Sequence, residues 1–141
     1  MKKENLINED VALNELEHFI GVWVENPVKK EDLPKVYPHI YEALISGNLV
    51  LEKDNPIYTM VKPFEDMEGQ IAFTQITFKT RISPLTAANL AKGINLDTDE
   101  LNYAIELLCY VIDKNKFILD KFRQKDYATV REIASLFMNA G

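Results

Sequence analysis

The amino-acid sequence predicts an α+β fold: a small antiparallel sheet of two to three strands, flanked by N-terminal helices and a C-terminal helical bundle. In the first and last thirds of the chain, apolar residues recur every three or four positions, which is typical of amphipathic helices. Between residues 49 and 82 the period falls to two, which is typical of strands with one buried face. We therefore expect a single domain (1–141) with a helical N-terminal extension (1–48), a β-hairpin or meander (49–82) and a helical C-terminal part (83–141).

The first part of the chain predicts two helices. Val11, Leu16 and Phe19 belong to an apolar stripe that runs to Trp23, and Asn8 or Asp10 can cap its start. Asn26-Pro27 is expected to end this helix. The second helix is expected over residues 33–46, with Val36, Tyr37, Ile40, Tyr41, Leu44 and Ile45 on its inner face. Asp32 is its expected cap, Pro38 is expected to delay or bend it, and Gly47 to end it.

The middle part predicts strands at residues 49–51, 57–61 and 71–82, with a turn at Asp54-Asn55-Pro56 and a loop over residues 64–70. In the third strand, Ile76, Phe78 and Ile82 fall on one face. Ile71 and Phe73 are out of phase with that series. We therefore expect a bulge or a change of partner near Thr74.

The last part is helical again. Ser83 is expected to cap a short helix that ends before Gly93, and Asp97 is expected to cap a long helix while Glu100 reaches back. One or two helical turns are expected over residues 117–122. A final helix is expected from about Asp126, with inward-facing Tyr127, Val130, Ile133, Ala134, Phe137 and Met138.

Composition excludes several classes of function. A net charge of −6 leaves no uniform positive field to gather phosphates, so we expect no nucleic-acid partner. The basic groups at 29–30, 114–116 and 121–125 have acidic neighbours and are interpreted as solvated surface charge. No apolar segment follows Met1 as a secretion signal would, and no stretch approaches the ~20 apolar residues of a membrane helix. We therefore expect a protein of a reducing cytoplasm.

No pattern of residues predicts an active site. Cys109 is the single cysteine and is expected to be a buried, inert thiol. Read as a calcium loop, the run from Asp97 would need glycine and glutamate where Asn102 and Leu108 stand. The cluster Glu65, Asp66 and Glu68 is interpreted as a solvated loop. The two histidines and three serines lack the neighbours of a metal or nucleophile site, so we expect no catalytic, cofactor-binding or metal-binding residue and no enzyme activity.

The helix expected over residues 99–113 is unusually apolar. A helix that is apolar around most of its circumference is either wrapped by its own domain or partly covered by a partner. The sequence favours the first explanation without excluding the second. If a partner binds here, the expected contact residues are Leu101, Ile105, Leu108, Tyr110, Ile112 and Arg81.

From Leu49 onward the order of features resembles a known family. A short strand and a Pro-Ile step (Pro56-Ile57) precede a second strand, which ends in Arg81 before a Pro/Thr-rich turn and helix. A long apolar helix follows, and Asp126 opens a last helix that reaches Phe137. This order is similar to that of the tail assembly chaperones of long-tailed phages, the family that includes the Mu-type proteins. Asn89 stands where the family tends to carry an acidic residue, and residues 1–48 have no counterpart.

The resemblance implies a protein of the bacterial host cytoplasm that is absent from the virion. It implies binding to the long, helical tape-measure protein and recruitment of tail tube subunits during assembly, with exposed apolar grooves and homo-oligomerisation. Two alternatives remain: a small adaptor or regulatory protein, and a structural tail component of the virion. A helix-turn-helix DNA-binding pair around Gly93 is weaker, because the second helix is apolar and acidic at its start.

Overall fold

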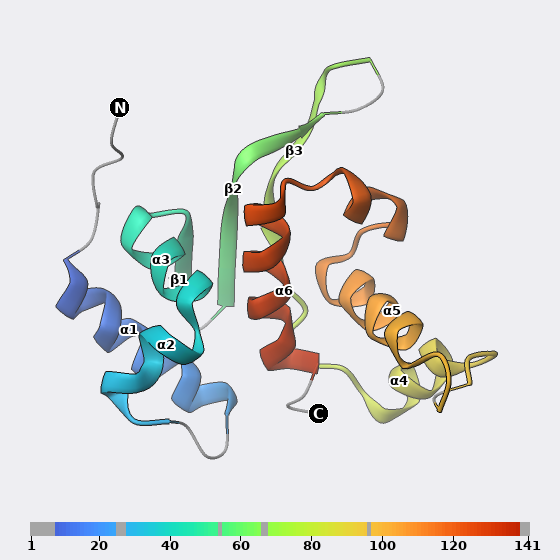
Figure 1. The fold of residues 1–141 in the computed structure, drawn as a ribbon, viewed down its shortest axis with the longest axis horizontal. Coiled ribbons are helices and arrows are strands. Elements are labelled where there is room, and N and C mark those ends of the chain that lie inside the picture. Colours follow the sequence, from blue (N-terminus) through green and yellow to red (C-terminus); the bar gives the residue numbers. More distant parts are fainter. Residues whose placement is uncertain (1–7, 25–27, 54, 66–67, 96, 139–141) are drawn as a thin grey trace.

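The computed structural model describes residues 8–24, 28–53, 55–65, 68–95 and 97–138, which form six α-helices and a three-stranded antiparallel sheet of order β1-β2-β3 (Figure 1). The helices are α1 (Glu9–Trp23), α2 (Leu33–Val36), α3 (Pro38–Ser46), α4 (Pro84–Ala91), α5 (Glu100–Ile112) and α6 (Gln124–Met138). The strands are β1 (Leu49–Glu52), β2 (Asn55–Glu65) and β3 (Ile71–Thr77), and the short 3-10 helices are η1 (Lys30–Asp32) and η2 (Lys116–Lys121). The predicted α+β class is confirmed.

Helix α6 lies at the centre of the fold. It packs against α3 and β2 on one side and against α5 on the other (Figure 1). One hydrophobic core runs through α1, α3, the sheet, α5 and α6. Phe137 joins its parts, since its ring contacts Trp23 at 5.1 Å, Phe78 at 6.3 Å and Phe19 at 6.4 Å between centroids. The N-terminal helices therefore share the core with the rest of the chain.

Helix α1 begins as the sequence predicted. The Asn8 side chain accepts a hydrogen bond from the Asp10 N–H at 2.7 Å and caps the helix. The predicted stripe is confirmed at Leu16, Phe19 and Ile20, which are buried; only its first position differs, because Ala12 is buried there and Val11 is 48% exposed. The expected Asn26-Pro27 stop lies outside the described residues.

The second predicted helix is divided at Tyr37. Because the residue before a proline is disfavoured in helical conformation, Tyr37 adopts φ −124° and ψ 60°, and α3 restarts at Pro38. Asp32 makes no side-chain capping bond, so that prediction is wrong, and Val36 is 46% exposed rather than inward-facing. Gly47 ends α3 at φ 79°, as predicted.

The sheet carries a large bulge. Thr59 pairs with Gln75 and Phe64 with Phe73, so four residues of β2 (60–63) lie opposite the single residue Thr74. The irregularity expected near Thr74 is confirmed, with the extra residues on β2. Strand β2 reaches Glu65, so the predicted 64–70 loop is shorter than expected. Beyond the bulge, the β2–β3 hairpin projects from the body of the molecule (Figure 1).

Strand β3 ends at Thr77, five residues before the predicted end at residue 82. The predicted buried face is nevertheless confirmed, since Ile76, Phe78 and Ile82 are all buried. The Lys79 N–H donates to the Val111 carbonyl at 2.7 Å and so joins the end of β3 to the end of α5. None of the described helices has the length and apolar character needed to cross a membrane.

The C-terminal helices start close to the predicted places. Ser83 caps α4 by accepting from the Thr86 N–H at 3.1 Å. The predicted capping box of α5 is wrong: Asp99 occupies the N-cap position without a side-chain bond, and the Asp97 N–H donates to the Asn95 side chain at 3.0 Å. The predicted turns before the last helix form η2, and α6 begins at Gln124, two residues before Asp126.

Candidate functional site

A buried carboxylate, Asp126, joins α6 to the bulge of β2. It is fully buried and accepts three hydrogen bonds, from the Tyr58 hydroxyl at 2.6 Å, the Val61 N–H at 2.8 Å and the Lys62 N–H at 3.1 Å. Both backbone donors belong to the bulge, where the ladder with β3 is interrupted and the N–H groups need other acceptors. Asp126 also lies in the first turn of α6, where the helix dipole favours an anion. These contacts allow a buried charge to be tolerated here.

Tyr58, which donates its hydroxyl hydrogen bond to Asp126, lies in the same buried environment. Its pKa is raised above the ordinary value, first by burial and then by its hydrogen bond to the Asp126 carboxylate. A raised pKa keeps the hydroxyl protonated and donating at neutral pH. Tyr58 therefore acts as a structural donor, not as a base.

A second carboxylate of α6 holds the start of α3. Glu132 accepts from the Ile40 N–H at 2.6 Å and thereby supplies the capping acceptor that α3 lacks in its own sequence. Burial raises the pKa of Glu132, while the N–H groups of Ile40 and His39 and the charge of His39 act in the opposite direction. Helix α6 thus fixes both α3 and β2 through buried or half-buried acids.

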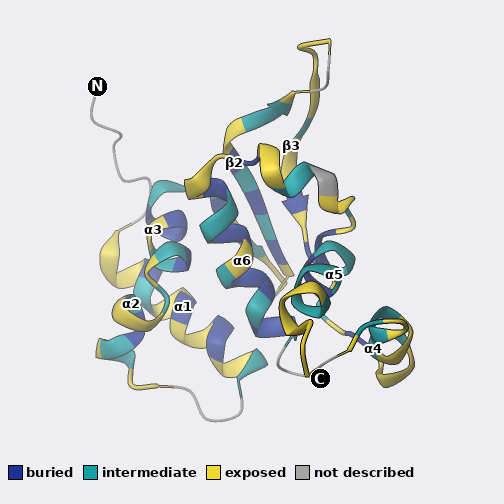
Figure 2. Ribbon diagram, turned by 45° about the vertical axis from the view of Figure 1, so that its right-hand side comes forward, coloured by how far each residue is buried: buried dark blue, intermediate teal, exposed yellow. Residues whose placement is uncertain are grey.

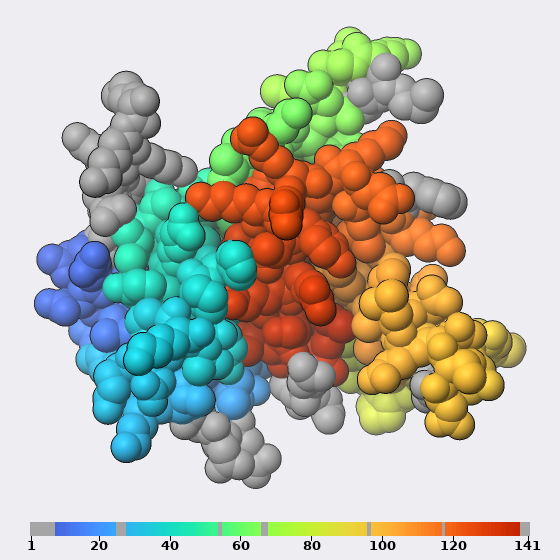
Figure 3. All heavy atoms as spheres, viewed as in Figure 1, coloured from blue at the N-terminus to red at the C-terminus, as the bar shows by residue number. Residues whose placement is uncertain are grey.

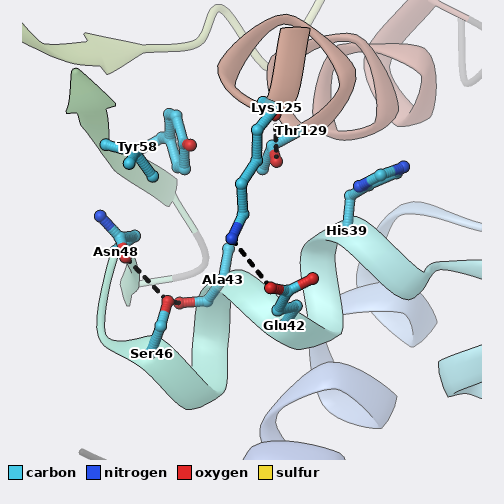
Figure 4. Close-up of a pocket in the computed structure, with 9 residues that line it drawn as sticks. His39, Glu42, Ala43, Ser46, Asn48, Tyr58, Lys125 and Thr129 are labelled. Atoms are coloured by element: carbon cyan, nitrogen blue, oxygen red, sulfur yellow. Dashed lines mark hydrogen bonds and ion pairs between the residues drawn. The ribbon is translucent and has the colours of Figure 1, made fainter. Parts of the chain in front are cut away.

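A groove of about 690 Å³ opens between α3 and the start of α6. His39, Glu42, Val61, Arg123 and Lys125 are among its lining residues. Lys125 reaches from α6 to Glu42 on α3 at 2.9 Å (Figure 4). Both side chains are more than half exposed, so this pair contributes little to stability. A smaller space of about 10 Å³ beneath it is large enough for roughly one water molecule.

The groove holds no arrangement typical of covalent catalysis. The nearby Ser46 hydroxyl contacts the Ala43 carbonyl at 3.2 Å and the Asn48 side chain at 2.8 Å, and neither is a base (Figure 4). The pKa of Cys109 is raised by burial and by Glu106, the opposite of an activated thiol. Among the described residues, no group of three His, Cys, Asp or Glu side chains could hold a metal ion. Asp66 of the predicted acidic loop lies outside the described residues.

The structure separates the predicted partner-contact residues into three groups. Leu108 and Ile112 are buried in the core, where they are 3% and 1% exposed. Ile105 and Tyr110 are half-buried, and the Tyr110 ring lies under the Lys79 ammonium group at 4.0 Å. Leu101 and Arg81 are exposed. The C-terminal end of α5 is therefore wrapped by the domain, and its N-terminal end is open.

The open end of α5 and helix α4 form a lobe, the α4–α5 lobe, over the described residues 84–95 and 97–106. Helix α4 has no buried residue and packs against α5 (Figure 2). Leu85 and Leu101 are 72% and 73% exposed, more than any other large apolar side chain of the described chain. Figure 3 shows the lobe standing apart at one corner of the molecule.

Sequence reasoning missed several of these residues. Leu85 follows Pro84 in a short helix, and its apolar character alone does not show whether the core or solvent receives it. Glu132 follows Arg131 on an amphipathic helix and looks like a surface charge in the sequence, and only the folded chain brings it to α3. The resemblance did single out Asp126 as a helix start, but its contacts lie 64 to 68 positions away along the chain. No local signal could have found those contacts.

Comparison of the sequence with known protein families and with curated proteins, and of the fold with solved structures, gives no match.

Proposed function

We propose that this chain is a non-enzymatic protein-binding domain, and that its partner-binding surface is the α4–α5 lobe. The observation that carries the proposal is the exposure of Leu85 and Leu101 on two helices that pack against each other. Exposed leucines on rigid helices are costly in water and gain free energy when a partner covers them. An amphipathic helix laid against such a surface is a common mode of recognition.

More specifically, we propose that the chain is a phage tail assembly chaperone that binds the tape-measure protein during tail assembly in the bacterial cytoplasm. The order of features from Leu49 to Phe137 supports this assignment. Two residues of the resemblance also have clear structural roles, since Asp126 holds the bulge of β2 and Phe137 joins the aromatic core. A domain without an activated nucleophile, but with an exposed apolar lobe, suits a holding function better than a catalytic one.

The proposal is tested by co-expressing the chain with a candidate tape-measure protein, the long helical protein encoded nearest to it. We expect the two to co-purify, and we expect the chain to be absent from purified mature particles by quantitative mass spectrometry. Replacing Leu85 and Leu101 together by serine should reduce the co-purified amount at least tenfold. Serine at Val36 and Val50 is the control, because these apolar side chains are also exposed (46% and 54%) but lie outside the lobe.

Three outcomes would count against the proposal. Detection of the chain in mature particles at stoichiometric amounts would make it a structural tail component. Failure to bind the tape-measure candidate, with capture of a different and identified cellular protein through the lobe, would make it an adaptor. Equal binding by the lobe and control variants would remove the lobe as the contact surface.

A further inference from the structure

Two hollows beside the start of α6 share a wall and form one groove, called here the basic groove. The larger, of about 690 Å³, lies towards α3, and the smaller, of about 100 Å³, lies along β2. Arg123 lines both hollows, and every residue of β2 from 60 to 65 lines one or the other. At the rise of an extended chain, this stretch of β2 spans about 17 Å. The groove is therefore long enough for a segment of extended peptide.

Four basic side chains from three elements line the groove. They are Lys62 of β2, Lys121 of η2, and Arg123 and Lys125 around the start of α6. Lys125 forms an ion pair with Glu42 at 2.9 Å. Among the described residues, no carboxylate forms an ion pair with Lys62, Lys121 or Arg123, and all three side chains are exposed. Folding thus adds a cation from the distant β2 to those that the sequence places around residues 121–125.

Two nearby carboxylates leave these three cations unpaired. Glu65 lines the same hollow as Lys62 and Lys121 but forms no ion pair with either. Asp126 is fully buried behind the bulge, where three neutral donors, two of them backbone N–H groups, occupy its oxygens. The groove therefore offers positive charge that no carboxylate of the described chain takes up.

Apolar surface accompanies this positive charge. Val61 is 40% exposed and lines the larger hollow, together with the half-buried Ala128. The half-buried Pro63 and Phe64 line the smaller hollow. Because this surface gains free energy when an apolar group covers it, a ligand that suits the groove carries apolar side chains as well as negative charge.

We propose that the basic groove binds an acidic peptide segment of another protein, in which carboxylates flank an apolar side chain. The carboxylates of the segment pair with Lys62, Lys121 and Arg123, and its apolar side chain covers Val61. The guanidinium group of Arg123 is suited to hold one carboxylate through two parallel hydrogen bonds. About six extended residues match the length of the groove.

The charges around the groove favour a peptide over a nucleic acid. A nucleic-acid backbone carries a negative charge at every phosphate, so its affinity requires many cations in a row. Here the chain as a whole has a charge of −6, and Glu42 and Glu65 lie in the groove itself. A peptide can place neutral residues opposite these two carboxylates, whereas a phosphate backbone cannot.

This inference goes beyond the proposed function, because the groove and the α4–α5 lobe lie on different parts of the molecule. The lobe stands at the lower right of Figure 1, while α6 begins in the upper part beside β2. The lobe variant, Leu85→Ser with Leu101→Ser, should therefore bind an acidic peptide as the unmodified chain does. Failure of one proposal can then be distinguished from failure of the other.

Fluorescence anisotropy with a labelled peptide tests the groove. The probe is the fluorescein-labelled peptide Glu-Glu-Leu-Glu-Glu-Leu-Glu-Glu. At about 0.1 M salt, where the Debye length is about 10 Å, we expect saturable binding of one peptide per chain. Binding should weaken at about 1 M salt, where the Debye length is about 3 Å. A peptide with glutamine in place of every glutamate, and one with glutamate in place of both leucines, should each bind about tenfold more weakly or worse.

Neutralising variants locate the binding surface. Lys62→Gln with Arg123→Gln should weaken binding of the probe by about tenfold or more, because charged hydrogen bonds on both sides of the groove are lost. Lys29→Gln with Lys92→Gln is the matched control, since it removes two positive charges from exposed residues outside the groove. It should bind the probe within about twofold of the unmodified chain.

Four results would overturn the proposal, once circular dichroism has shown that the variants are folded. These are no binding of the probe, equal weakening by the groove and control variants, equal binding of the glutamine peptide, and equal binding of the peptide without leucine. A labelled single-stranded DNA of about 20 nucleotides provides a further arm. If the chain binds this DNA more tightly than the probe, and the groove variant loses that binding, the groove belongs to nucleic acid and not to a peptide.

Discussion

Replacing Asp126 by alanine tests whether the buried carboxylate holds the bulge of β2 to α6. The change leaves the Tyr58 hydroxyl without its acceptor in a buried position, which costs about 1 to 3 kcal/mol. The N–H groups of Val61 and Lys62 each also lose a hydrogen bond to a charged acceptor, worth about 1.5 to 3 kcal/mol, and recover most of it because they are only partly buried and can turn to water; together they add about 2 kcal/mol. We therefore expect a total loss of about 3 to 5 kcal/mol in the free energy of unfolding. A domain in the middle of the typical stability range of about 5 to 15 kcal/mol would remain folded in the absence of denaturant.

Urea denaturation followed by the fluorescence of Trp23 measures this loss. With a dependence on urea of about 2 kcal/mol/M, the midpoint should fall by about 1.5 to 2.5 M without a change in slope. Asp120→Ala is the control, because Asp120 is exposed on η2 and its removal should change stability by less than about 0.5 kcal/mol.

Hydrogen exchange gives a local readout of the same variant. The amides of Val61 and Lys62 should lose protection to a greater degree than the amide of Thr59, which donates to the Asn48 carbonyl at 2.6 Å and does not contact Asp126. The reasoning is refuted if the two bulge amides and the Thr59 amide change by the same factor while the midpoint falls by less than about 0.5 M urea.

Three further changes probe other contacts. Because the pKa of Tyr58 is raised, its contribution to stability is complete below about pH 10 and is lost as the pH rises further. The difference in the free energy of unfolding between the unmodified chain and Tyr58→Phe should therefore narrow in urea titrations above about pH 10. A difference that widens would contradict the role of Tyr58 as a donor to Asp126. The pKa of Glu132 is also raised, so its contribution to stability is complete below about pH 4.5 and is lost as the pH rises through its pKa in the folded state. Between about pH 4.5 and 7, Glu132→Gln should therefore gain stability relative to the unmodified chain in the same urea titrations. The opposite trend would show that the hydrogen bond to the Ile40 N–H outweighs burial. In the same urea titrations, Phe122→Ala should cost about 3 to 4 kcal/mol, because its buried ring contacts Phe64 and Phe73 at the base of the hairpin. Leu85→Ala on the exposed lobe is the control and should cost less than about 0.5 kcal/mol. Similar losses in the two variants would show that the Phe122 ring is not packed in this way.

The sequence was sufficient to predict the features that local chemistry decides. The Asn8 and Ser83 caps and the Gly47 stop follow from the residue types that helix ends accept. The buried face of Ile76, Phe78 and Ile82 follows from a period of two. In each case the residues that set the structure lie within a few positions of the feature itself.

Predictions that required distant partners were less successful. Val11 and Val36 suit an inward position by residue type, yet the neighbouring elements leave both about half exposed. The expected cap Asp32 was not used, while Glu132, from 92 positions beyond Ile40, supplies the acceptor at the start of α3. Periodicity gives the direction of a side chain around its own helix, but it cannot give the position of the element that packs there.

The apolar helix over residues 99–113 shows how these two kinds of information combine. Its composition predicted that most of its surface would be covered, and its C-terminal end is covered, with Leu107, Leu108, Val111 and Ile112 in the core. Its N-terminal end is open because α4, the element that follows β3, packs only along one side and contributes no buried residue. The composition of α5 thus predicted its covered end, whereas the placement of α4 decides that its other end is open.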